Sequence, residues 1–131
     1  MKLQRGDQLP AFVLRDIDGA RFDSGTIWQR RNLLLVSLPP GADAHGDAKV
    51  AAWVAAVRTM DDAFQEYETT VVVTQEAVGG LAASVIVADR WGEIIAIEPC
   101  DPAADRPPVA ELREWLRFVA HACPECEGEA R

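Results

Sequence analysis

Positively charged side chains are scarce in this sequence. Lysine and arginine together number 13, against 21 aspartates and glutamates in 131 residues, so the formal net charge is -8. Nucleic-acid binding needs clustered lysine and arginine to neutralise phosphates, and docking on an anionic membrane surface needs basic segments. The charge balance therefore argues against both kinds of partner, and the acidity mainly favours solubility.

Long apolar runs are also missing. The apolar stretches fall short of the roughly 18 residues that suggest a membrane-spanning helix. The first residues, Met1 to Asp7, lack the apolar core of a signal peptide. We therefore expect a cytoplasmic protein. The sequence also lacks a phosphate-binding glycine loop, a usable serine–histidine–aspartate arrangement and a carboxylate cluster suited to a divalent ion.

Cysteine is limited to three residues, Cys100, Cys123 and Cys126. An odd number does not make the framework of paired disulfides that holds small secreted domains together. Cys123 and Cys126 form a Cys-Pro-Glu-Cys motif near the end of the sequence. In an intracellular protein, this spacing indicates redox or metal chemistry.

The rest of the composition is that of a globular protein. Apolar residues make up 49% and charged residues 26%, and 131 residues suit one domain. We expect that domain to span residues 1–122 and an acidic tail carrying the two close cysteines to span 123–131. The patterns predict extended segments at 10–16 and 17–22, strands at 32–38, 69–74, 84–88 and 93–97, and helices at 47–67 and 109–122.

The two predicted helices rest on apolar residues repeated every three or four positions. In the first helix these are Val50, Trp53, Val54, Val57, Met60 and Phe64. The second helix has a similar stripe that includes Trp115, and Pro124 prevents its continuation. We expect Trp53 and Trp115 in the core. Trp91, in the turn between the last two strands, is open to two interpretations, core burial or a partly exposed contact surface.

The order of elements predicts an α/β fold. A parallel strand pair joined by a crossover helix comes first, followed by an antiparallel pair and a closing helix. This is the order of a thioredoxin-like three-layer sandwich. We expect a central mixed sheet of about four strands, an N-terminal β-hairpin and flanking helices.

Three segments resemble the peroxiredoxin-like family of alkyl hydroperoxide reductases, thiol-specific antioxidants and related redoxins. Residues 6–19 are similar to the family's opening pattern GD-x-x-P-x-F-x-L-x-D-x-x-G. The apolar strand at 33–38 ends in prolines, and residues 85–94 are similar to the family's hairpin F-x-I-D-x-x-G-x-I. The resemblance implies a thioredoxin fold and a role for thiols in redox homeostasis and antioxidant defence.

The sequence departs from this family where the family carries its reactive cysteine. That cysteine begins the first long helix, because unpaired N–H groups and the helix dipole stabilise a thiolate there. The corresponding residues 40–48 contain no cysteine and no threonine. The family's arginine and the thioredoxin proline both fall near Ala82 or Ala83. We therefore expect no peroxidase activity by the family's mechanism, and we interpret Asp43 and Asp47 as helix-capping acids.

The Cys123–Cys126 pair supports a first hypothesis of thiol–disulfide exchange with a protein thiol or disulfide partner, with Cys100 as an optional resolving cysteine. The pair follows the negative end of the last helix and has glutamates as neighbours. Both features disfavour a thiolate, so we expect each thiol pKa above the reference value of about 8.5. The pair would then be a slow attacking nucleophile.

A second hypothesis is a non-catalytic interaction module whose terminal cysteines bind zinc. Cys123 and Cys126 supply two of four ligands, and the others would be His121, Cys100 or the same pair on a second copy in a homodimer. Bland alternatives stay open. They are an unliganded tail, Cys100 as a small buried hydrophobe, a solvated His45 and His121 as a cation at the helix end.

Overall fold

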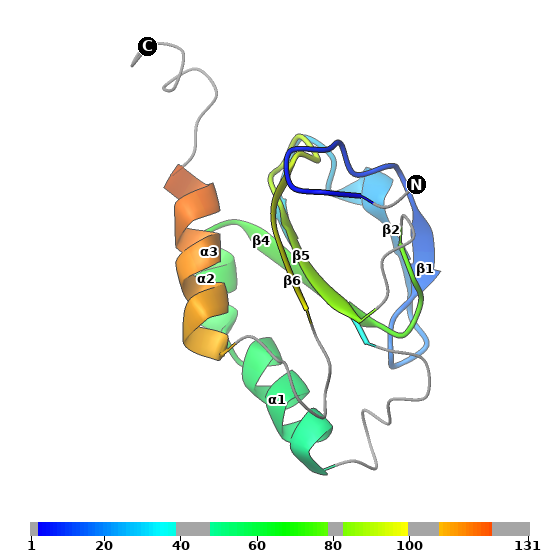
Figure 1. The fold of residues 1–131 in the computed structure, drawn as a ribbon, viewed down its shortest axis with the longest axis vertical. Helices are drawn as coiled ribbons and strands as arrows, with labels where there is room; N and C mark the ends of the chain where they lie inside the picture. The colour runs from blue at the N-terminus through cyan, green and yellow to red at the C-terminus, as the bar shows by residue number, and fades with distance from the viewer. Residues whose placement is uncertain (1–2, 39–47, 79–82, 100–107, 122–131) are drawn as a thin grey trace.

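The computed structural model describes residues 3–38, 48–78, 83–99 and 108–121, and these form a layered α/β domain (Figure 1). Within them the elements in chain order are β1 (Val13–Arg15), β2 (Arg21–Asp23), the 3-10 helix η1 (Ser24–Thr26), β3 (Asn32–Ser37), α1 (Ala48–Arg58), α2 (Asp61–Glu66), β4 (Thr69–Thr74), β5 (Ser84–Ala88), β6 (Ile94–Pro99) and α3 (Val109–His121). None of the helices in these ranges is long and apolar enough to cross a membrane.

The central sheet has the strand order β4-β3-β5-β6. Strands β3 and β4 are parallel, whereas β3 and β5, and β5 and β6, are antiparallel. Ser37 pairs with both Thr74 and Ser84, and Ser84 pairs in turn with Pro99. One end of the sheet therefore contains the last residues of β3, β4 and β6 and the first residue of β5.

Strand β3 is buried on both faces, as its continuous apolar sequence predicts. Leu34 and Val36 belong to one core cluster, with apolar residues of the three α-helices. Leu33 and Leu35 belong to a second cluster, with Leu9 and other residues from the N-terminal part of the chain. In Figure 1 the helices lie on one side of the sheet and the β1–β2 hairpin on the other. The predicted mixed four-stranded sheet, hairpin and layered arrangement are confirmed.

Two hairpin turns share the sequence pattern Asp-x-x-Gly and the same hydrogen bonds. The Oδ1 atoms of Asp16 and Asp89 each accept hydrogen bonds, all 2.9 Å long, from the backbone N–H groups two and four residues further on. Gly19 and Gly92 follow with φ values of 86° and 82°, which glycine adopts without the steric cost of a side chain. The two patterns quoted in the family resemblance therefore correspond to one repeated local structure.

The prediction of a single helix over residues 47–67 is wrong, because the structure has two helices there, α1 and α2. Thr59 donates its hydroxyl hydrogen to the carbonyl of Ala56 at 2.9 Å, and the N–H of Met60 bonds to Val57, three residues back, at 3.3 Å. These shorter-range bonds end α1. Met60 is only 1% exposed, and its carbonyl accepts the N–H of Phe64 at 2.9 Å at the start of α2.

Candidate functional site

The sheet end at Ser37 is where the resemblance locates the family's chemistry, since the chain leaves β3 there and enters α1. The Ser37 hydroxyl, which is fully buried, donates to the carbonyl of Glu76 at 2.6 Å. The Thr74 hydroxyl donates to the carbonyl of Arg15 at 2.7 Å and accepts the N–H of Glu76 at 3.1 Å. Both hydroxyls therefore fasten backbone segments to the sheet, and neither is placed as a nucleophile.

Ala83 stands directly before β5, where the sequence comparison located the missing family arginine and proline. Its φ is 53°, in the left-handed region. Proline has a φ fixed near -65° and cannot adopt this conformation. The backbone conformation at Ala83 therefore excludes a proline like that of the thioredoxins. This agrees with the lack of that proline in the sequence.

The predicted site residues lie almost entirely outside the described ranges. This applies to Cys100, Cys123 and Cys126 and to residues 39–47. His121 is the last residue of α3, and its side chain lies outside the description too. Among the described residues no three histidines, cysteines or carboxylates gather in a way that would hold a metal ion. The redox and zinc hypotheses for the terminal cysteines thus remain predictions.

Helix α3 is the last described element before the terminal cysteines in the chain. Leu112 and Leu116 are fully buried and Val119 is 2% exposed, so this face packs into the core on the helix side of the sheet. Figure 1 shows α3 ending at the top of the view, toward the turn between β5 and β6 and away from the sheet end at Ser37. Cys123 follows this end of α3 by two residues in the sequence.

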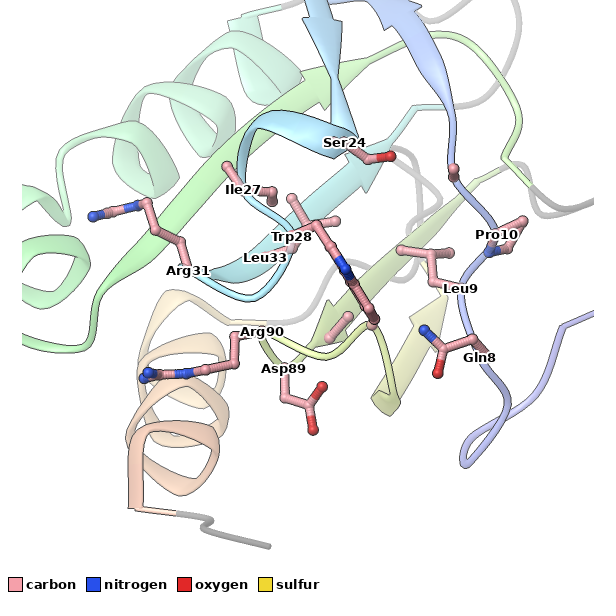
Figure 2. A pocket seen from close by; sticks show the side chains of 14 residues that line it. Gln8, Leu9, Pro10, Ser24, Ile27, Trp28, Arg31, Leu33, Asp89 and Arg90 are labelled. Carbon is pink, nitrogen blue, oxygen red and sulfur yellow. The ribbon is translucent and has the colours of Figure 1, made fainter.

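An apolar pocket of about 410 Å³ lies on the hairpin side of the sheet, at the end opposite Ser37. Three chain segments form its walls. They are residues 8–11, residues 24–33 and the β5–β6 turn at residues 88–92. Figure 2 shows Trp28 in the middle of the pocket, with Leu9 and Gln8 on one side and Asp89 below.

The rings of Trp28 and Trp91 contact each other beside this pocket. Their rings meet edge to face with centroids 6.5 Å apart, and the residues are 47% and 42% exposed. Partial exposure, one of the two interpretations of Trp91, is therefore confirmed, whereas Trp53 and Trp115 are half-buried and pack against the core. Trp28 was not predicted as a site residue, because its position in a turn segment is a weak signal in the sequence.

The sheet order, the crossover from β3 through α1 and α2 to β4, and the closing helix α3 define a thioredoxin-like fold. No protein-family model matches the sequence, and no curated protein matches it either. Solved structures do match. They include peroxiredoxins and thioredoxin-family thiol:disulfide oxidoreductases, so the predicted peroxiredoxin-like fold is confirmed.

Three of these structures illustrate the similarity. A reduced 2-Cys peroxiredoxin from Plasmodium vivax has a TM-score of 0.67 and 13% identity, and the match covers 89% of this chain and 82% of that one. AhpC from Mycobacterium tuberculosis has a TM-score of 0.61 and 13% identity, covering 95% and 98%. A thioredoxin-family thiol:disulfide interchange protein from Chlorobium tepidum TLS has a TM-score of 0.61 and 10% identity, covering 89% and 98%. At such identities the likeness establishes the fold alone.

Proposed function

We propose that this chain is a thioredoxin-fold thiol–disulfide exchange protein that uses Cys123 and Cys126 and lacks peroxidase activity. One observation carries the proposal. Residues 39–47, which connect β3 to α1 in the position of the family's reactive cysteine, contain no cysteine. Two of the described hydroxyls at that sheet end, on Ser37 and Thr74, are engaged in backbone hydrogen bonds. Sulfur chemistry in this chain therefore falls to the remaining cysteines.

The exchange consists of two displacements at sulfur. The Cys123 thiolate attacks a disulfide of a partner protein, forms a mixed disulfide and releases one partner thiolate, which takes up a proton. The Cys126 thiol then loses its proton, and its sulfur attacks Cys123 in the mixed disulfide. This step releases the second partner thiol and leaves a Cys123–Cys126 disulfide, so two electrons pass from this chain to the partner.

The expected direction of the exchange follows from the surroundings of the pair. A dithiol whose reduced form is stabilised as a thiolate is a strong oxidant. Here the end of α3 and the neighbouring glutamates oppose a thiolate, so the pair is suited to reduce disulfides. A reducing dithiol also fits the cytoplasm, where thiols are kept reduced. The domain over residues 1–122 would serve as the carrier of the dithiol tail.

The test is the reduction of insulin disulfides by dithiothreitol, followed as turbidity with and without the full chain. We expect acceleration that rises between pH 7 and 9, because the thiolate fraction grows over this range. Cys123→Ala and Cys126→Ala should return the rate to background. When the reduced Cys126→Ala variant is mixed with insulin in the absence of dithiothreitol, it should accumulate a mixed disulfide on Cys123. Cys100→Ala is the matched control, because it removes one thiol and leaves the pair intact.

Peroxide consumption and zinc content distinguish the proposal from its alternatives. Hydrogen peroxide consumption with a thioredoxin system should stay at background. Wild-type chain no faster than Cys123→Ala in the insulin assay would refute the exchange proposal. The structural metal site would instead be supported by bound zinc and by a melting temperature that falls on chelation. The expected zinc content is one ion per chain, or one ion per two chains if mass measurement shows a homodimer.

A further inference from the structure

The apolar pocket beside Trp28 lies at the opposite end of the sheet from Ser37, and its lining contains no cysteine. We propose that it binds an uncharged, ring-containing small molecule. Its volume of about 410 Å³ falls in the range of roughly 300–1,000 Å³ typical of small-molecule sites, which are mostly apolar with few polar groups. The apolar part of its lining includes Leu9, Pro10, Ala11, Ile27, Trp28 and Leu33.

The charged side chains at the pocket already have partners within the protein. Arg31 donates from Nε to the Thr70 hydroxyl at 2.8 Å and from its guanidinium to the carbonyl of Thr69 at 2.7 Å. Arg90 forms an ion pair with Glu68 at 3.0 Å. In Figure 2 both arginine side chains extend away from Trp28. Both guanidinium groups are therefore directed to partners within the protein and not to the space beside Trp28.

The remaining polar side chains at the pocket each make at least one hydrogen bond within the protein. The Asp89 carboxylate accepts two N–H groups in its own turn. The Ser24 hydroxyl accepts the N–H of Phe12 at 2.9 Å, and Gln8 Nε2 donates to the carbonyl of Trp91 at 2.6 Å. Desolvating an unpaired charge is costly, so this lining favours a neutral ligand over an anionic one.

The backbone around Trp28 is held in a defined, strained conformation. Gln29, the next residue, has a φ of 66°, and its N–H donates to the carbonyl of Arg90 at 2.7 Å. Positive φ at a residue other than glycine is uncommon and tends to occur at functional sites. This bond ties the segment carrying Trp28 to the β5–β6 turn. The half-exposed ring of Trp28 is therefore fixed at the pocket by tertiary contacts.

The experiment is a fluorescence titration of the full chain with N-phenyl-1-naphthylamine, a neutral two-ring probe. Its counterpart, 8-anilinonaphthalene-1-sulfonate, has the same rings and one negative charge. We expect saturable binding of the neutral probe to one site, and a Kd at least tenfold higher for the sulfonate. Equal or tighter binding of the sulfonate, or no saturation with the neutral probe, would overturn the proposal.

Two variants at Ala11 locate the site, and a third variant, at Phe118, is the control. Ala11 lines the pocket and is exposed, so Ala11→Trp should fill the pocket from its rim, leave the melting temperature unchanged and raise the Kd of the neutral probe at least tenfold. Ala11→Asp, which places a charge there, should also weaken binding and replaces the first variant if that one fails to fold. Phe118→Ala, which truncates an aromatic residue 51% exposed on α3, should leave the Kd within twofold. Wild-type affinity in a folded Ala11 variant refutes the assignment to this pocket.

Discussion

Replacing Gly92 with alanine should destabilise the protein through a collision that can be traced to one side chain. Gly92 has a φ of 82°, and a Cβ atom added there would lie 2.3 Å from Gln8 Nε2. The left-handed backbone itself costs alanine about 1–2 kcal/mol. Moving the Gln8 amide away breaks its hydrogen bond to the Trp91 carbonyl, which adds about 1 kcal/mol. We therefore expect Gly92→Ala to lower the free energy of unfolding by about 2–3 kcal/mol.

Gly19→Ala is the matched control for this prediction. Gly19 sits at the same place in the other Asp-x-x-Gly turn, with a φ of 86°, and an added Cβ meets nothing within 4 Å. It should therefore carry only the backbone cost, about 1–2 kcal/mol. The difference of about 1 kcal/mol corresponds to roughly 4 °C in melting temperature for a chain of this size.

Urea unfolding followed by circular dichroism provides the assay, with Gln8→Ala as the second arm of a double-mutant cycle. In the Gln8→Ala background the colliding amide is gone, so Gly92→Ala should cost no more than Gly19→Ala does. The neighbouring Trp28 Cζ3 atom, 3.3 Å from the added Cβ, needs to shift by only a few tenths of an ångström. The reasoning is refuted if Gly92→Ala and Gly19→Ala cost the same in the wild type, or if Gln8→Ala leaves the extra cost in place.

Two further predictions concern the sheet. Leu34→Ala, at a fully buried position of β3, should lower the free energy of unfolding by about 3–5 kcal/mol through cavity formation. Val13→Ala, at a position 53% exposed, should lower it by less than about 1 kcal/mol. Equal midpoints of urea unfolding for the two variants would contradict the assigned core. Ser37→Ala leaves the carbonyl of Glu76 without the hydroxyl bonded to it and should cost about 1–2 kcal/mol. The same variant should retain wild-type insulin reduction, and a loss of that activity in the folded variant would show that Ser37 takes part in the chemistry.

The strands of the central sheet were predictable because their signals are local. Residues 69–74 are β-branched throughout and form β4 over the same range, since such side chains suit a strand. The continuous apolar run of β3 predicted burial on both faces, and the two core clusters divide its side chains between them. The Asp-Gly pair at residues 18–19 similarly predicted the first hairpin turn.

The break between α1 and α2 was not predictable from periodicity. The apolar spacing continues from Val57 through Met60 to Phe64, and the hydrophobic residues in both helices face the same core cluster. The helix ends where the Thr59 hydroxyl bonds the backbone and Met60 is buried. A hydroxyl that competes for a backbone carbonyl is a weak signal in sequence, because threonine also occurs within helices.

By itself the sequence determined the layered α/β architecture, the positions of the sheet strands and the lack of a cysteine between β3 and α1, because each depends on residue identity and short-range pattern. The tertiary structure alone decided that residues 8–11, 24–33 and 88–92 meet to form an apolar pocket. In the sequence these are three separate turn-rich segments with no shared periodicity. They come together only because the β5–β6 turn and the start of β3 lie at one end of the sheet, where the N-terminal segment is hydrogen-bonded to the β5–β6 turn and the start of β6.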